Sequence, residues 1–95
     1  MRKVSTEVIR REIRVTGDVQ GVGFRYRAKY AASGLGLTGW VKNDWDGSVV
    51  MEVQGTEEMI FQMLKLINQS SYIRIDCMES KDLELCEGEY GFHIR

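Results

Sequence analysis

A glycine-rich segment constrains the fold most, because it separates two different hydrophobic patterns. Glycines occupy positions 17, 21 and 23. Before them, residues 9–16 alternate, with Ile13 and Val15 on one side, which is typical of a β-strand. After them, apolar residues recur at helical spacing, namely Phe24, Ala28, Ala31, Ala32 and Leu35. The sequence therefore predicts a strand, a tight loop and a helix that ends near Gly34 and Gly36.

The same loop predicts an anion site. Glycine allows several backbone N–H groups to converge on one point, and a helix N-terminus leaves such donors unpaired with a partial positive charge. Arg25 adds a planar guanidinium that fits two oxygens of a phosphoryl group. The segment lacks the Gly-Lys-Ser/Thr of a Walker A motif, and Tyr26 stands where a dinucleotide fingerprint needs glycine. Ordinary turn glycines remain the competing interpretation.

The middle of the chain predicts a hairpin and a second helix. Thr38–Asn43 and residues 48–54 flank an Asp-Gly turn, which is a hairpin signal. Thr56 is suited to cap the following helix, whose first turn carries Glu57 and Glu58. The expected buried stripe of this helix is Ile60, Met63, Leu64 and Ile67.

The C-terminal part predicts two more strands. Residues 72–78 place Ile73, Ile75 and Cys77 on one face of a fourth strand, residues 79–89 are expected to form an exposed acidic loop, and residues 92–95 a short last strand. The complete order predicts an α+β, ferredoxin-like split βαβ fold (βαββαβ). Its antiparallel sheet should carry two helices on one face, a short extra C-terminal strand, and the first and third strands side by side in the middle.

Length and composition limit the classes of partner. Ninety-five residues predict a single domain, 1–95, with residues 1–8 as a loosely ordered extension. A net charge of −1, from 13 basic and 14 acidic residues, argues against a general nucleic-acid surface. Without an apolar run or a signal sequence, a cytoplasmic protein with no membrane contact is expected. Two cysteines, Cys77 and Cys86, predict reduced thiols more readily than a disulfide.

A second cluster, residues 39–48, completes a recognisable pattern. Together the two clusters closely resemble the acylphosphatase family pattern, G-x-V-Q-G-V-x-F-R followed by G-x-V-x-N-x-x-D-G-x-V. The first part is met by Gly17, Val19, Gln20, Gly21, Val22, Phe24 and Arg25, and the second by Gly39, Val41, Asn43, Asp46, Gly47 and Val49. The resemblance extends over residues 9–95, although the chain has no proline where many members carry Gly-Pro after the second helix.

The resemblance implies hydrolysis of the carboxyl–phosphate bond of acyl phosphates. Arg25 and the loop amides of Gln20, Gly21, Val22, Gly23, Phe24 and Arg25 would bind the phosphoryl oxygens, and Asn43 would position the attacking water. A carboxylate is a good leaving group, so positioning and charge stabilisation suffice, and no metal or cofactor is expected. The partners implied are a small-molecule acyl phosphate and inorganic phosphate, the second as product and competing anion. The protein is expected to be a monomer.

Other interpretations of the same residues stay open. A magnesium site could be built from Asp18, Asp44 and Asp46. Each of them stands at a glycine turn, however, where aspartate usually caps its own backbone, and this turn role is favoured. Trp40 and Trp45 could stack on a substrate but are expected to be exposed or half-buried sheet aromatics, and His93 is expected to be structural.

Two functions of a different class compete with catalysis. RNA-recognition domains share this topology, but their aromatic strand motif is absent from residues 48–53. The second alternative is a non-catalytic anion-binding or accessory domain, like the acylphosphatase-like segment of larger maturation proteins. The loop would recognise the phosphoryl group of a substrate and not its acyl part.

Overall fold

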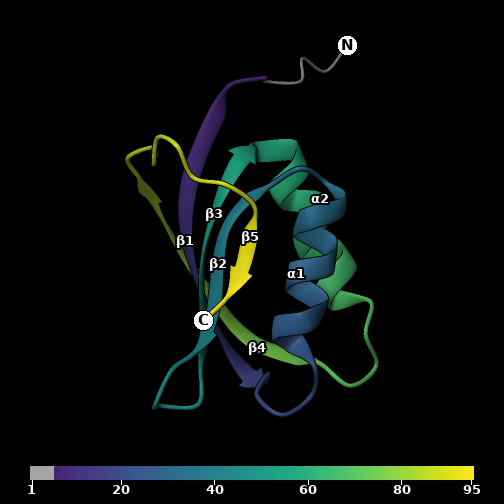
Figure 1. Cartoon of the computed structure of the whole chain (residues 1–95). Helices are drawn as coiled ribbons and strands as arrows, with labels where there is room; N and C mark the ends of the chain where they lie inside the picture. The colour runs from purple at the N-terminus through teal and green to yellow at the C-terminus, as the bar shows by residue number, and fades with distance from the viewer. Residues whose placement is uncertain (1–5) are drawn as a thin grey trace.

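The computed structural model describes residues 6–95 and has an α+β architecture. The elements in chain order are β1 (Val8–Asp18), α1 (Phe24–Gly34), β2 (Thr38–Asn43), β3 (Val49–Thr56), α2 (Glu57–Asn68), β4 (Arg74–Leu83) and β5 (Phe92–Ile94). Both helices cover the same face of one sheet (Figure 1). Neither helix of residues 6–95 has the length and apolar character to cross a membrane. Residues 1–5 of the expected N-terminal extension lie outside the described residues, and the sheet already begins at Val8.

The sheet has the strand order β4-β1-β3-β2-β5. The first and third strands lie side by side in its middle, as the sequence predicts. The four main strands pair antiparallel as expected, and the short extra C-terminal strand is present as β5, which pairs with β2 in parallel. The reason is directional: the chain reverses after β4 and reaches the far edge of the sheet running the same way as β2.

The core lies between the sheet and the helices. Ile13 and Val15 of β1 are buried against it, and so are Phe24 and Ala28 of α1. In α2 the predicted stripe is buried at Ile60, Met63 and Ile67, whereas Leu64 is only partly buried. The predicted cap is confirmed, since the Thr56 hydroxyl accepts a hydrogen bond from the backbone N–H of Met59 at 3.3 Å.

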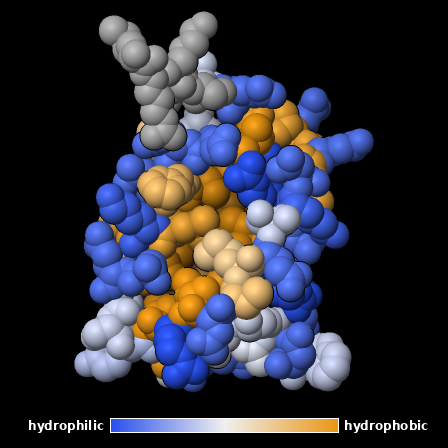
Figure 2. All heavy atoms as spheres, turned by 180° about the vertical axis from the view of Figure 1, so that it is seen from behind, coloured by the Kyte–Doolittle hydropathy of each residue, from blue (hydrophilic) through white to orange (hydrophobic). Residues whose placement is uncertain are grey.

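The fourth strand differs most from the sequence prediction. The expected loop over 79–89 is wrong in its first part, because β4 continues to Leu83 by pairing with β1. The strand register is irregular here, and Asp76 has no paired residue in β1 between the pairs Gly17↔Ile75 and Thr16↔Cys77. This bulge reverses the alternation, so Ile75 packs on the core while Cys77 is exposed. Seen from behind, apolar side chains gather in a hollow framed by polar ones (Figure 2).

A partly buried ion pair attaches the C-terminal segment to the sheet. Arg10 of β1 is 5% exposed, and its guanidinium donates to both carboxylate oxygens of Glu89, at 2.7 and 3.0 Å. It also donates to Glu52 of β3 at 3.0 Å. The hydrogen bonds from Arg10 lower the pKa of the Glu89 carboxyl below its ordinary 4.5, and those to Glu89 and Glu52 raise the pKa of Arg10. The Glu89 pair therefore fixes the segment that leads into β5.

This pair predicts acid-sensitive stability. Because the pKa of Glu89 is lower in the folded chain, its stabilisation is present above the unfolded value of 4.5 and is lost as the pH falls through the folded value. Glu89→Gln should lower the unfolding free energy at neutral pH by about 2 kcal/mol, the cost of a charge-assisted hydrogen bond. In thermal unfolding monitored by circular dichroism, the difference in melting temperature between the two proteins should shrink below pH 4.5. A difference that stays constant down to the acid transition would contradict this role.

Candidate active site

The loop between β1 and α1 leaves backbone donors available. Gly21 and Gly23 have positive φ angles of 74° and 82°, a conformation that other residues rarely adopt. Gly23 is the N-cap of α1, no side chain caps the helix, and its first turn carries no acidic residue. The N–H groups at this helix start thus have neither a side-chain cap nor an acidic residue of the first turn beside them, which suits an external anion.

Arg25 stands in the first turn of α1 and is half-buried. Among residues 6–95, its guanidinium has no hydrogen bond, ion pair or ring contact. The other arginines of this range have partners: Arg10 with Glu89, Arg11 with Asp82, Arg14 with Asp44, Arg27 with the Leu66 carbonyl, Arg74 with Asp18 and Arg95 with the Trp40 ring. Arg25 thus keeps its donors for a ligand.

Asn43, the last residue of β2, carries an unsatisfied acceptor. Its side-chain Oδ1 is buried and has no hydrogen-bond partner in the part of the chain that the structure describes. A buried acceptor without a partner costs about 1–3 kcal/mol, so such atoms are usually satisfied by water or ligand. The position can therefore hold a water molecule as a hydrogen-bond donor.

Gln20 joins the loop to the segment that follows Asn43. Its side-chain Nε2 donates to the backbone oxygens of Asp44 and Ser48, at 2.7 and 2.9 Å. The β1–α1 loop and the β2–β3 turn accordingly lie at the same end of the molecule (Figure 1). The sequence pattern predicts a role for Gln20 only through its backbone amide, as a donor to the anion. The side-chain role was missed, because it depends on a contact 24 and 28 residues away along the chain.

The aspartates near the two clusters are engaged within the protein. Asp44 Oδ1 accepts from the N–H of Trp45 at 2.9 Å, and Asp46 Oδ1 accepts from the N–H of Ser48 at 3.0 Å, so the predicted turn roles are confirmed. Asp18 differs, since it forms an ion pair with Arg74 at 3.1 Å. Within residues 6–95, no group of three or more His, Cys, Asp and Glu side chains is placed to hold a metal ion.

A contact network on the β2–β3 turn was not predicted from the sequence. Arg14 of β1 donates to Asp44 at 3.1 Å and to the Ser48 hydroxyl at 2.7 Å. The Ser48 hydroxyl in turn donates to Asp46 at 2.6 Å. The hydrogen bonds from Ser48, with a smaller contribution from the charge of Arg14, lower the pKa of Asp46. Only the alternation that puts Arg14 opposite the core could have indicated these contacts.

The aromatic side chains have different surroundings. Trp45, at the tip of the turn, is 94% exposed. Trp40 is buried, contrary to expectation, because the Arg95 guanidinium lies 4.6 Å from its ring centroid and Lys42 lies at 5.6 Å. The Nε2 of His93, a residue expected to be structural, lies 2.6 Å from the Tyr90 carbonyl oxygen.

Comparison with known proteins decides the family. The acylphosphatase family model matches residues 11–94, which includes both clusters. The chain belongs to the acylphosphatase family. It is therefore an enzyme of the hydrolase class.

Individual relatives agree with this assignment. An acylphosphatase of Clostridium perfringens strain 13 is 44% identical over 86 residues, which span 90% of this chain and 97% of the relative. The crystal structure of acylphosphatase from Bacillus subtilis superposes with a TM-score of 0.83 at 32% identity, over 94% of this chain and 99% of that one. Full-length HypF in its phosphate- and nucleotide-bound form gives a TM-score of 0.83 at 29% identity, with 99% of this chain matching 12% of HypF.

Proposed function

We propose that this protein hydrolyses acyl phosphates to a carboxylate and inorganic phosphate without a metal ion. Arg25 and the backbone amides of residues 20–25 hold the phosphoryl oxygens, and Asn43 orients the attacking water. The observation that carries the proposal is the pair of unsatisfied groups at one end of the fold: an arginine without a partner among residues 6–95 and the buried Asn43 Oδ1. Gln20 connects the two segments on which they stand.

The reaction needs positioning more than acid–base chemistry. The water oxygen attacks phosphorus, the bond from phosphorus to the acyl oxygen breaks, and the carboxylate leaves with the bonding electrons while the water proton passes to solvent. Negative charge on the phosphoryl oxygens is stabilised by the Arg25 guanidinium and the N–H groups at the start of α1. Asn43 Oδ1 accepts a hydrogen bond from the water and so fixes its direction of attack. Inorganic phosphate, the product, competes for the same donors.

The alternative is an anion-binding accessory domain without turnover. The HypF match favours it to the extent that a segment of this fold occurs inside a much longer protein. Two observations support catalysis instead: relatives of this chain's own length carry the name acylphosphatase, and Asn43 offers an acceptor that anion binding alone does not need. We further propose that the enzyme works as a cytoplasmic monomer.

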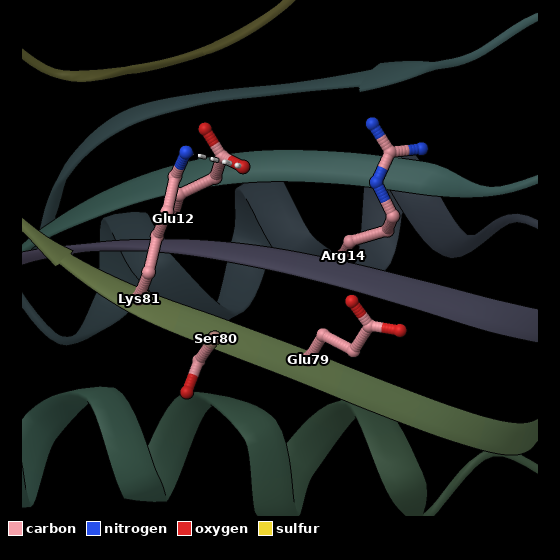
Figure 3. A pocket seen from close by; sticks show the side chains of 5 residues that line it. All are labelled: Glu12, Arg14, Glu79, Ser80 and Lys81. Atoms are coloured by element: carbon pink, nitrogen blue, oxygen red, sulfur yellow. Dashed lines mark ion pairs between the residues drawn. The ribbon is translucent and has the colours of Figure 1, made fainter.

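The open face of the sheet, which is the face that the helices do not cover, gives no support to a nucleic-acid module. Where RNA-recognition domains stack bases on aromatic rings, this face presents side chains of both charges. Figure 3 shows four of them, with Glu12 paired to Lys81 at 3.9 Å and Arg14 and Glu79 beside them. Acidic groups so close to the basic ones would repel a phosphate backbone.

The proposal is tested by turnover of benzoyl phosphate in excess EDTA. We expect full activity on this acyl phosphate and almost none on phosphate monoesters or ATP, whose leaving groups need more assistance than the site provides. The measurement is release of inorganic phosphate with and without the chelator. Loss of activity on chelation would refute the metal-free mechanism, and binding of phosphate without any turnover would favour the accessory-domain alternative.

A further inference from the structure

Arg14 lies outside the proposed phosphate-binding loop of residues 20–25, which we call the anion loop. Its side chain nevertheless reaches the β2–β3 turn. In the sheet register Arg14 stands opposite Val50 on one side and Glu79 on the other. Glu79 is thus the neighbour with which an ion pair would be expected. Figure 3 shows instead that the guanidinium extends over β3 and away from Glu79. The side chain is therefore committed to the turn.

The contacts of Arg14 converge on one atom. Its Nη1 donates to Asp44 Oδ2 at 3.1 Å, to Asp46 Oδ2 at 3.4 Å and to Ser48 Oγ at 2.7 Å. The two acidic residues and the serine belong to the turn of residues 44–48. Two carboxylates close together would repel one another, and the guanidinium between them removes this repulsion. Arg14 therefore holds the turn in one arrangement.

The turn that Arg14 holds begins directly after Asn43. The backbone N–H of Asp44 donates to the Ser48 carbonyl at 2.8 Å, which closes the turn on the end of β2. Gln20 donates to the carbonyls of the same two residues from the anion loop. The segment is thus fixed through its side chains by Arg14 and through its backbone by Gln20. A shift of the turn would move Asn43 relative to the bound phosphoryl group.

We propose that Arg14 is a positioning residue for the hydrolysis: through Asp44, Asp46 and Ser48 it fixes the turn so that Asn43 presents its water to phosphorus. This inference rests on the proposed function, in which Asn43 orients the water. It adds a residue outside both sequence clusters, and it assigns the ion-pair network on the open sheet face to the reaction.

The first test separates turnover from phosphate binding. Arg14→Ala should lower kcat for benzoyl phosphate about tenfold, because misplacement of a positioning group by a fraction of an ångström is costly. The inhibition constant of inorganic phosphate should change less than about twofold, since Arg14 does not contact the anion loop. Arg14→Lys should restore most of kcat, because three acceptors around one nitrogen suit an ammonium with three donors. Glu79→Gln is the matched control and should leave kcat unchanged.

The second test asks whether Arg14 acts through Asn43. In an Asn43→Ala background, Arg14→Ala should change the residual kcat less than about twofold, because residues that act as a unit are not additive. A full tenfold loss in that background would overturn the inference, as would normal kcat in Arg14→Ala alone. Circular dichroism should show a native fold for each variant, since Arg14 is 36% exposed. Absence of turnover by the unaltered protein would instead contradict the proposed function itself.

Discussion

Arg25→Ala is expected to lower kcat/KM for benzoyl phosphate on the order of 10³-fold while the protein stays folded. The guanidinium has no partner among residues 6–95, so its removal breaks no hydrogen bond, ion pair or ring contact there, and the buried residues of α1 are Phe24, Ala28 and Ala32. The loss should appear both as weaker phosphate inhibition and as slower turnover, because the same donors hold substrate, transition state and product.

Two substitutions make the Arg25 result specific. Arg25→Lys should recover little activity, because a point charge does not reproduce the two-oxygen fork of a guanidinium. Arg27→Ala on the same helix removes a side chain that donates to the Leu66 carbonyl, and it should leave kcat/KM unchanged. If Arg25→Ala and Arg27→Ala lose activity equally, general destabilisation of α1 rather than anion binding would explain the effect.

Asn43→Ala is expected to reduce kcat on the order of 10²-fold with nearly unchanged phosphate inhibition. Its buried Oδ1 has no hydrogen-bond partner within residues 6–95, and in the proposed mechanism the attacking water is that partner. Removing the acceptor leaves the anion loop intact but leaves the water without an orienting group. Steady-state kinetics with benzoyl phosphate, and inhibition by inorganic phosphate, measure the two effects separately.

The control for Asn43 is Asn68→Ala, at the exposed end of α2, which should match the unaltered protein in both constants. Near wild-type kcat in Asn43→Ala would show that the water is oriented by another group. Equal losses in kcat and in phosphate affinity would show that Asn43 contacts the phosphoryl group and not the water.

Local patterns predicted the elements that lead into the site. The alternation at Ile13 and Val15, the helical stripe that starts at Phe24 and the glycines between them each depend on residues close in sequence. For the same reason the Thr56 cap and the turn roles of Asp44 and Asp46 were predictable. The first cluster and the part of the second from Asn43 into the turn lie at the same end of the structure, where Gln20 joins them.

Features that depend on distant pairing were not predictable from one sequence. The length of β4 is set by its antiparallel pairing with β1, which overrides the acidic composition of residues 79–83. The parallel pairing of β5 depends on where the chain returns after β4. The contacts of Arg14 cross 30 to 34 residues, and nothing in the local sequence distinguishes this arginine from its neighbours Arg10 and Arg11.

The measurement that tests the central claim most directly is the effect of inorganic phosphate on thermal unfolding of the unaltered protein and of Arg25→Ala. Phosphate binds only the native loop, so at about 100 times its dissociation constant it should stabilise the unaltered protein by roughly 2.7 kcal/mol. In a domain of this size that raises the melting temperature on the order of 10 °C. Arg25→Ala should show almost no rise, with chloride at equal ionic strength as the screening control. An equal rise in both proteins would contradict the assignment of Arg25 as the phosphate-binding residue, and with it the proposed active site.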